Sequence, residues 1–308
     1  MHQRPVVFFR HGLGDCLMTL PSLRALTTLL PEITLICNAG AGELFYAGLP
    51  WRDVIEPRAT QPGDIWSFPV EDVIERVGRC DLLLSLNPQC PPQLKMLIAC
   101  FNPPVSLGFT PDFRTAIPWD RDRHSVDAAF KLVQQLDSRL RVEDFAAPPQ
   151  LSPRALTLAR QIYGLLPPNT RVLAVHPDTQ ARKMWLHDRL NETLQVFLER
   201  HPNFAVLVVG RSKQRFEGRH ADRIIPCTSL AIEVAFSLVS MADLFLGIDS
   251  CMLHMADLCG VPGVGLFGPT RSCEFGFRFA RHRTIQADHD LALIPVGPVL
   301  EALEELAP

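Results

Sequence analysis

The sequence predicts an α/β protein with two domains. Short apolar runs of the kind that form buried parallel strands alternate with stretches of helical periodicity along the chain. The 308 residues exceed one typical domain, and a hydrophobic content of 47% is ample for two cores. Three prolines fall between helical segments in 145–153, so we place the domains at 1–148 and 149–308. The expected strands are 6–9, 33–37, 81–86, 171–175, 204–209, 243–246 and 264–267.

The first expected strand leads into a glycine-containing loop and then into a helical stretch at 16–30. Gly12 and Gly14 permit positive φ angles and a close approach of a ligand to the backbone. Asp15 stands at the start of the helix, where it either projects into the crevice at the sheet edge or only caps the helix. His11 suits a substrate contact or an ordinary loop position. The loop is not a dinucleotide fingerprint, because G-x-G-x-x-G would need glycine where Leu17 stands.

A second loop of this kind follows the apolar run 244–246. We expect Gly247 to end that strand, and Asp249 and Ser250 to offer N-cap side chains to a short helix that ends near Gly260. The next strand stops at 268–270, so two loops and one helix N-terminus meet at the carboxyl edge of the sheet, where open α/β folds bind ligands. Such an N-terminus suits a phosphate or diphosphate. The same residues also suit a capped helix between two core strands.

Three motifs make the pattern specific. The first is Gly14-Asp15 with Pro21 and Leu23-Arg-Ala-Leu26, and the second is His176-Pro-Asp-Thr-Gln-Ala-Arg-Lys183-Met-Trp185. The third is Asp249-Ser-Cys-Met-Leu-His254, continued by Gly260-Val-Pro262 and Phe267-Gly-Pro-Thr270. In this order they resemble glycosyltransferase family 9, the heptosyltransferases. The resemblance implies a GT-B fold, with two Rossmann-like domains facing a central cleft, the acceptor on 1–148 and the nucleotide sugar on 149–308. It also implies that the last helix, near 296–306, packs back on the first domain.

The resemblance assigns roles to residues of this chain. Asp15 falls on the family's catalytic base and Lys183 on its diphosphate-contacting lysine. Cys251 stands where the family has glycine, so its side chain would crowd the diphosphate or reshape the sugar pocket. Ser250 replaces threonine. The donor-binding residues expected in this way are Gly12, Gly14, His176, Thr179, Asp249, Ser250, Cys251, Met252 and His254, with Glu217 as a weaker candidate near the ribose.

Several of these residues have ordinary structural explanations. His176 could only orient its loop by hydrogen bonding, and Lys183 could belong to a surface pair. His254 lies on the helix face of Ser250 and points either at phosphate or into the core.

The function that the resemblance implies is metal-independent, inverting glycosyl transfer, without a cofactor, from a nucleotide sugar to an acceptor hydroxyl. Heptose from ADP-heptose is the expected donor, as in lipopolysaccharide biosynthesis. Asp15 would take the acceptor proton, while Lys183 and the N-terminus at 250–252 would stabilise the leaving diphosphate. The acceptor could be a carbohydrate, a lipid-linked sugar, a protein or a small molecule. The alternatives are another donor, a sugar-phosphate epimerase of similar architecture, or a nucleotide-sugar-binding protein without transfer.

Composition excludes other classes. Nine cysteines are scattered without a C-x-x-C pair, which indicates reduced thiols in a cytoplasmic protein and no metal site. No signal peptide and no apolar run near membrane-spanning length is present, although contact with a membrane surface stays open. The net charge of −3 argues against nucleic acid as a partner.

Overall fold

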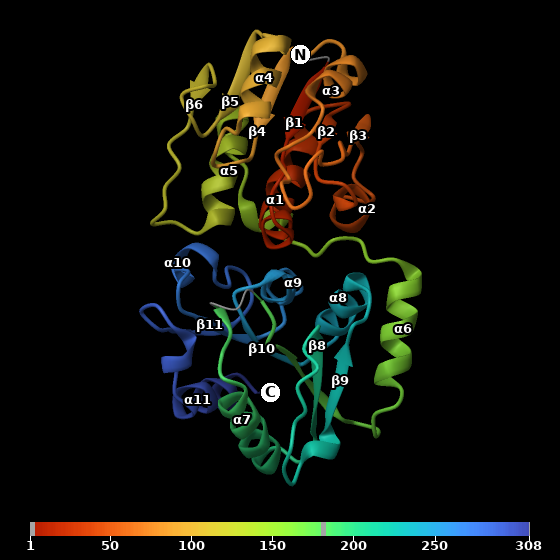
Figure 1. The fold of residues 1–308 in the computed structure, drawn as a ribbon, viewed down its shortest axis with the longest axis vertical. Helices are drawn as coiled ribbons and strands as arrows, with labels where there is room; N and C mark the ends of the chain where they lie inside the picture. Colours follow the sequence, from red (N-terminus) through yellow and green to blue (C-terminus); the bar gives the residue numbers. More distant parts are fainter. Residues whose placement is uncertain (1–3, 180–182, 308) are drawn as a thin grey trace. The chain divides into compact units, whose positions relative to one another are not determined.

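A computed structural model describes residues 4–179 and 183–307 of the chain (Figure 1). The chain divides into two compact units, the first ending at Gln150 and the second beginning at Leu151. Each unit contains one six-stranded sheet in which every neighbouring pair of strands is parallel. The α/β fold expected from the sequence is therefore confirmed.

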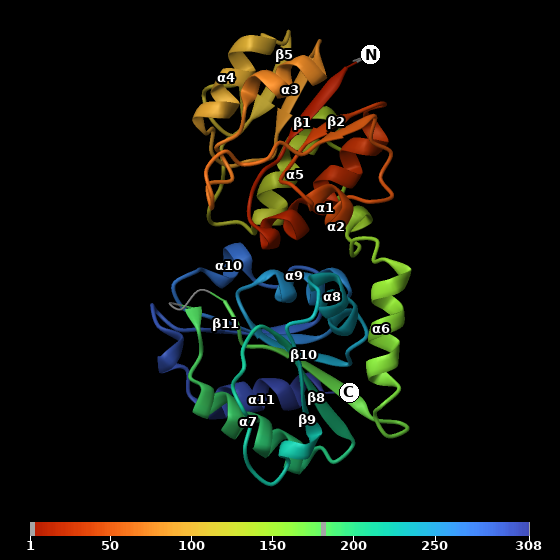
Figure 2. The same ribbon diagram turned by 45° about the vertical axis from the view of Figure 1, so that its right-hand side comes forward.

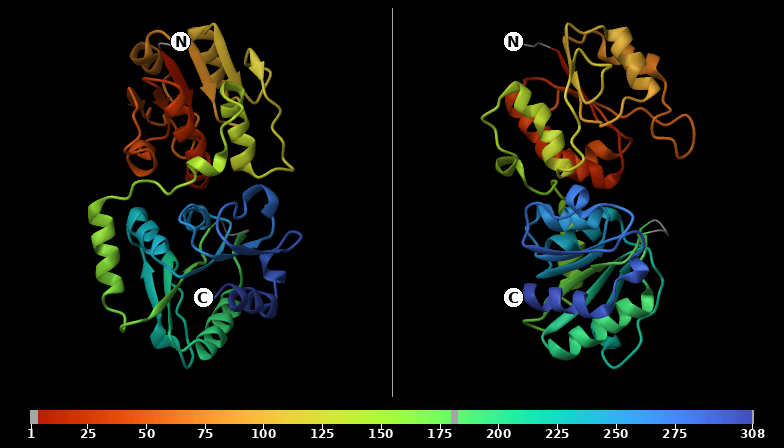
Figure 3. Two further views of the ribbon diagram at one scale, coloured as in Figure 1. Left: turned by 180° about the vertical axis from the view of Figure 1, so that it is seen from behind. Right: turned by 90° about the vertical axis from the view of Figure 1, so that its left-hand side faces the viewer.

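The first sheet has the strand order β3-β2-β1-β4-β5-β6. Helices cover both of its faces, with α1 packed on α5 and α3 packed on α4 (Figure 3). The strands are β1 (Pro5–Phe8), β2 (Thr34–Ile36), β3 (Asp53–Ile55), β4 (Leu82–Ser85), β5 (Val105–Gly108) and β6 (Thr115–Ala116). The helices are α1 (Leu13–Leu29), α2 (Ala41–Phe45), α3 (Val70–Val77), α4 (Pro92–Phe101) and α5 (Ser125–Leu136), with a 3-10 turn, η1, at Val142–Phe145.

The apolar runs of the first unit form strands because both of their faces are buried. Val6 and Phe8 of β1 belong to the cluster that includes Leu94 and Leu97 of α4. Val7, the residue between them, points to the other face and is also fully buried. A strand buried on both sides reads as a continuous apolar run, and this is the signal that the sequence carries here.

The second sheet has the order β12-β11-β10-β7-β8-β9. Helix α11 packs on α7 and on β11 and β12, while α8 packs on α6 and α9 (Figures 1 and 2). The strands are β7 (Arg171–His176), β8 (Phe204–Gly210), β9 (Ile224–Thr228), β10 (Leu244–Ile248), β11 (Gly263–Phe267) and β12 (His282–Gln286). The helices are α6 (Pro153–Tyr163), α7 (His187–Arg200), α8 (Ile232–Ser240), α9 (Cys251–Leu258), α10 (Ser272–Phe275) and α11 (Val296–Leu306), with 3-10 turns η3 (Ala221–Arg223) and η4 (Leu291–Leu293).

The two sheets share one connectivity. In each, the first strand lies in the centre, with the second strand on one side and the fourth on the other. The direction in which successive strands are added to the sheet thus reverses between β1 and β4 in the first unit and between β7 and β10 in the second. Loops that leave such a pair at its carboxyl end diverge and leave room for a ligand. This topology selects the two places where a site is expected.

One expectation about β10 is wrong. The strand does not end at Gly247 but runs through it to Ile248. A Cβ at position 247 would meet the ring of Phe245 at 2.5 Å. The glycine therefore makes room for an aromatic side chain inside the sheet and does not break the strand.

The last helix occupies 296–306, the range expected from the sequence. Its contacts with α7, β11 and β12 place it in the second unit. Its packing on the first domain stays a prediction. None of the helices in the described ranges is long and apolar enough to cross a membrane.

Candidate functional site

Arg10 anchors the loop that follows β1. Its guanidinium donates hydrogen bonds to the carbonyls of Ile65 at 2.8 Å and of Cys37 and Pro57 at 2.9 Å. Its backbone N–H donates to Asn87 Oδ1 at 3.0 Å, and Asn87 Nδ2 donates back to its carbonyl at 2.7 Å. Burial lowers the pKa of Arg10 to about 10. These bonds fix the loop after β1 beside the loop after β4. Nothing in the sequence pattern had marked Arg10 or Asn87 as important.

Asp15 lies in the first turn of α1 and forms a pair with His11. The two atoms His11 Nδ1 and Asp15 Oδ2 are 2.5 Å apart, and both side chains are about 30% exposed. Because a carboxylate only accepts hydrogen bonds, Nδ1 carries the proton in this contact. Asp15 is thus held by an imidazole, an arrangement that the sequence analysis did not anticipate.

The two glycines of this loop do not adopt the positive φ angles that the sequence analysis considered, while their role in letting a ligand approach stays a prediction. Gly12 has φ −62°, and neither Gly12 nor Gly14 is among the glycines with positive φ. Gly14 is part of α1. A Cβ at Gly12 would lie 3.0 Å from Asp15 Oδ2, so this glycine is needed for space beside the carboxylate and not for an unusual backbone angle.

In the second unit, three chain segments meet at Asp249. Lys183 Nζ lies 2.5 Å from Asp249 Oδ2, and Thr270 Oγ1 donates to the same oxygen at 2.7 Å. The side chains of Lys183 and Asp249 are only 15% and 10% exposed. Lys183 follows β7, Asp249 follows β10 and Thr270 follows β11, so the cluster stands at the switch point of the second sheet. Thr270 was not among the expected site residues.

Asp249 therefore does not cap α9. Ser250 occupies the N-cap position with extended backbone angles, yet its side chain makes no capping hydrogen bond. Its Oγ is buried and has no hydrogen-bond partner among the described residues. The expectation that these two side chains cap the helix is wrong, because the carboxylate of Asp249 is engaged by Lys183 and Thr270 instead.

The first turn of α9 carries a half-buried thiol. Burial raises the pKa of Cys251 to about 11, although the backbone N–H groups of Cys251 and Met252 act in the opposite direction. Met252 and His254 are buried, with His254 4% exposed. The thiol thus lies beside the N–H groups that a helix N-terminus offers to an anion.

His176 ends β7 and is nearly fully buried. Its Nδ1 lies 2.9 Å from the carbonyl oxygen of Val209 and, since a carbonyl only accepts, carries a proton. Burial lowers the pKa of His176. The ring is a neutral link between β7 and β8, which is the orienting role considered from the sequence.

Asp178 joins the loops after β7 and β8. Its Oδ2 accepts hydrogen bonds from the N–H groups of Arg211 and Ser212, the latter at 2.6 Å. Gly210 has φ +138°, and a Cβ there would lie 2.2 Å from the same oxygen. Thr179, the next residue along this loop, is half-buried. Asp178 and Gly210 were missed by sequence reasoning.

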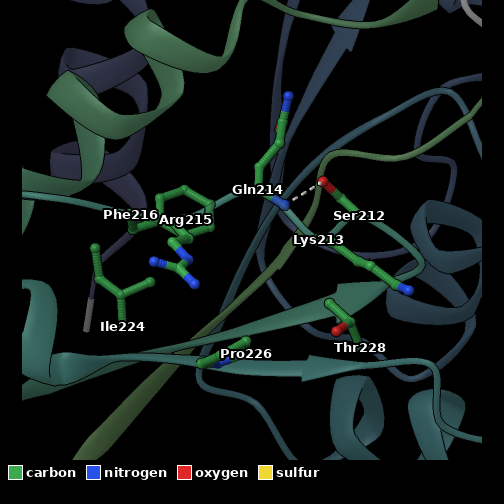
Figure 4. A pocket seen from close by; sticks show the side chains of 8 residues that line it. All are labelled: Ser212, Lys213, Gln214, Arg215, Phe216, Ile224, Pro226 and Thr228. Carbon is green, nitrogen blue, oxygen red and sulfur yellow. Dashed lines mark hydrogen bonds between the residues drawn. The ribbon is translucent and has the colours of Figure 1, made fainter.

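Glu217 lies on an exposed part of the loop after β8. Its N–H donates to Asn191 Oδ1 at 3.2 Å, and Asn191 Nδ2 donates to its carbonyl at 3.0 Å. The preceding residues of this loop face strand β9 across a pocket of about 350 Å³ (Figure 4). The lining residues are Ser212, Lys213, Gln214, Arg215, Phe216, Ile224, Pro226 and Thr228. None of the residues expected from the motifs lines this pocket, and Glu217 only follows it in sequence.

Comparison with known proteins identifies the family to which the chain belongs. Residues 96–289 match the model of glycosyltransferase family 9 (heptosyltransferase). The chain belongs to glycosyltransferase family 9. This family 9 protein is a glycosyltransferase, as the three motifs had indicated. None of the curated proteins resembles it closely enough in sequence to count as a relative.

Solved structures share the fold of this family 9 protein over nearly its whole length. A glycosyltransferase family 9 protein from Veillonella parvula is 17% identical with a TM-score of 0.80, and the match covers 98% of this chain and 96% of that one. E. coli ADP-heptose lps heptosyltransferase II is 16% identical with a TM-score of 0.71, over 99% and 98% of the two chains. E. coli heptosyltransferase WaaC with ADP is 14% identical with a TM-score of 0.69, over 99% and 100%. The two parallel sheets are those of the GT-B fold.

Proposed function

We propose that this glycosyltransferase transfers a sugar, most favourably heptose from ADP-heptose, to an acceptor hydroxyl by a metal-independent, inverting displacement. The observation that carries the proposal is the cluster of Lys183, Asp249 and Thr270 at the switch point of the second sheet. The ammonium group of Lys183 contacts Asp249, which Thr270 also holds and which directly precedes the N-cap residue of α9.

The donor site follows from this cluster. Lys183 has three ammonium hydrogens, and its contact with Asp249 uses one of them. The others would reach diphosphate oxygens, while the first N–H groups of α9 would add the partial positive charge of a helix N-terminus. Asp249 holds the ammonium in place and is itself held by Thr270, so that the charge is already positioned when the nucleoside diphosphate leaves.

The relatives support the choice of donor. Heptosyltransferase II is named for ADP-heptose, and WaaC is described in complex with ADP and with ADP-2-deoxy-2-fluoro heptose. We therefore place an ADP-linked heptose first among nucleotide sugars.

Asp15 is the proposed base. The acceptor oxygen attacks the anomeric carbon as the bond from that carbon to the diphosphate oxygen breaks, and the leaving group departs with the electron pair. The hydroxyl proton passes to the carboxylate of Asp15. Attack from the face opposite the leaving group inverts the anomeric centre. The described contact of Asp15 Oδ2 with His11 leaves Oδ1 for the hydroxyl.

The acceptor is proposed by class only. A carbohydrate, a lipid-linked sugar, a protein hydroxyl and a small molecule all supply the nucleophile that this step needs. The proposed place of action is the cytoplasm, where nucleotide sugars are available, with contact to a membrane surface if the acceptor is lipid-linked.

The alternative is a protein that binds a nucleotide sugar without transferring it. It is favoured by Cys251, whose thiol lies at the N–H groups that the diphosphate would use. Replacing Cys251 by glycine would then strengthen donor binding without producing turnover.

Replacement of Asp15 by asparagine distinguishes the two functions. We expect Asp15→Asn to keep the wild-type Kd for ADP-heptose and to lower kcat by about 100-fold or more, because the amide cannot take the proton. Asp72→Asn, on an exposed position of α3, is the control and should leave both quantities unchanged. A kcat of Asp15→Asn equal to that of the wild type would show that Asp15 is not the base. If the wild-type protein itself binds ADP-heptose but transfers no sugar, the result would favour the alternative.

A further inference from the structure

His11 is held by contacts to both its backbone and its ring. Asn38 Nδ2 donates a hydrogen bond to its carbonyl, and the neighbouring Arg10 is fixed at both its backbone and its guanidinium. The ring lies between the ring of Phe9, stacked at 6.3 Å, and the edge-on ring of Trp66 at 6.0 Å. In this arrangement Nδ1 is directed at Asp15 Oδ2.

The contact determines which oxygen of Asp15 is available. Nδ1 lies 2.5 Å from Oδ2, and among the described residues no further hydrogen bond to this carboxylate is found. Gly12 keeps the space beside Oδ2 open. The carboxylate is therefore oriented from one side, with Oδ1 directed elsewhere.

We propose that His11 is a positioning residue for Asp15, which fixes the carboxylate through Oδ2 and adjusts by its charge how readily Oδ1 accepts the acceptor proton. The inference rests on the proposed role of Asp15 as base. During transfer the acceptor proton moves to Oδ1, and the proton on Nδ1 stays where it is. The Asp15 proton leaves to solvent after the product departs, so protons balance over one cycle.

The charge of His11 changes near neutral pH. Burial lowers its pKa, but the hydrogen bond and charge of Asp15, with a contact from Gln89, raise it more, so that the net shift is upward from 6.5. Asp15 on α1 is the charged group that faces the ring, whereas the guanidinium of Arg10 points to carbonyls of other loops.

Among the described residues, the groups that contact His11 from the other elements carry no charge at neutral pH. Trp66 and Asn38 are neutral, Gln89 is neutral, and Cys16 contacts the backbone carbonyl of His11 and not the ring. Above the pKa of His11 the imidazole is neutral and stabilises the negative charge of the Asp15 carboxylate less. The carboxylate then accepts the acceptor proton more readily. The kcat of the wild type should therefore rise with pH through an ionisation above 6.5.

Two substitutions separate positioning from packing. His11→Asn keeps a donor N–H near the position of Nδ1 but does not titrate, and His11→Phe keeps the aromatic packing but removes the donor. We expect His11→Phe to lower kcat by about 10- to 100-fold with little change in the KM of the donor, because the base is no longer held in line. His11→Asn should retain most of the activity, and both variants should lose the ionisation in kcat between about pH 6 and 9. His289→Asn, at an exposed position, is the control.

A second readout does not depend on turnover. The pKa of His11, measured by NMR from its ring resonances, should lie above 6.5 in the wild type and fall in Asp15→Asn. Wild-type kcat in His11→Phe, or an ionisation that persists in His11→Asn, would overturn the positioning role. If the wild type transfers no sugar, the proposed function fails, and the NMR titration still decides the pair: an unchanged pKa in Asp15→Asn would overturn it.

Discussion

Asp249 Oδ2 accepts hydrogen bonds from both Lys183 Nζ and Thr270 Oγ1, at 2.5 and 2.7 Å. One carboxylate oxygen thus joins the loops that follow β7, β10 and β11. Since the pair is mostly buried, its geometry is less screened by solvent than that of a surface ion pair.

Removing this carboxylate should cost stability as well as binding. Asp249→Ala leaves the ammonium of Lys183 without its carboxylate partner in a mostly buried site, and we expect the free energy of unfolding to fall by about 1–3 kcal/mol. Denaturant unfolding measures it. Lys95→Ala breaks the exposed pair with Asp112 and should change stability by no more than about 0.5 kcal/mol. Equal effects of the two substitutions would contradict the structural role of the cluster.

Gly12→Ala should act on catalysis and not on folding. The new Cβ would lie 3.0 Å from Asp15 Oδ2 and push the carboxylate away from His11, so kcat should fall by about 10-fold or more at an unchanged Kd for the donor. Backbone strain is not expected, because φ at this position is −62°. Gly297→Ala is the matched control, since a Cβ there meets nothing within 4 Å. A large loss of stability in Gly12→Ala alone would show that the glycine serves the fold.

Gly210→Ala should loosen the loop that follows β8. The residue has φ +138°, and the added Cβ would lie 2.2 Å from Asp178 Oδ2. We expect a loss of about 2 kcal/mol or more in unfolding free energy. Faster amide exchange at Arg211 and Ser212 should accompany it, because their hydrogen bonds to Asp178 would be broken. Unchanged exchange at these two amides would count against this linkage.

His176 should make stability depend on pH. Its pKa is lowered by burial, so below 6.5 the unfolded chain binds a proton that the folded chain does not. Stability from this residue is therefore present above 6.5 and is lost as pH falls toward the lowered folded pKa. His176→Asn, which keeps a donor for Val209, should reduce this slope in unfolding experiments between about pH 5 and 6.5. A slope identical to that of the wild type would contradict a neutral, buried His176.

The sequence predicted the elements whose signal is local. Apolar runs such as 6–9 and 204–209 gave β1 and β8, because strands buried on both faces carry a continuous apolar pattern. The motif positions Lys183 and Asp249 were expected at one sheet edge, and the structure brings them into direct contact. Short edge strands such as β6, with two exposed residues, carry too little apolar pattern to be recognised.

The missed features depend on contacts between distant segments. Asn87 meets Arg10 across 77 positions of the chain, and Thr270 meets Asp249 across 21. Gly247 looked like a strand end, but its role is to make room for Phe245, which only packing reveals. His11 precedes α1 and pairs with Asp15 four residues later, and a polar pair at this spacing was the one signal in the sequence that could have indicated the contact.

The most direct test of the central claim is calorimetric titration with ADP, UDP, GDP, CDP and their sugar conjugates, using wild type, Lys183→Ala and the control Lys95→Ala. We predict that ADP-heptose binds most tightly to the wild type, that Lys95→Ala binds equally well, and that Lys183→Ala weakens binding by about 10-fold or more, because a charge-assisted contact to the diphosphate is lost. A preference for another nucleotide would change the donor. Equal affinity of Lys183→Ala and wild type for every ligand, or no binding at all, would contradict a diphosphate site at Lys183.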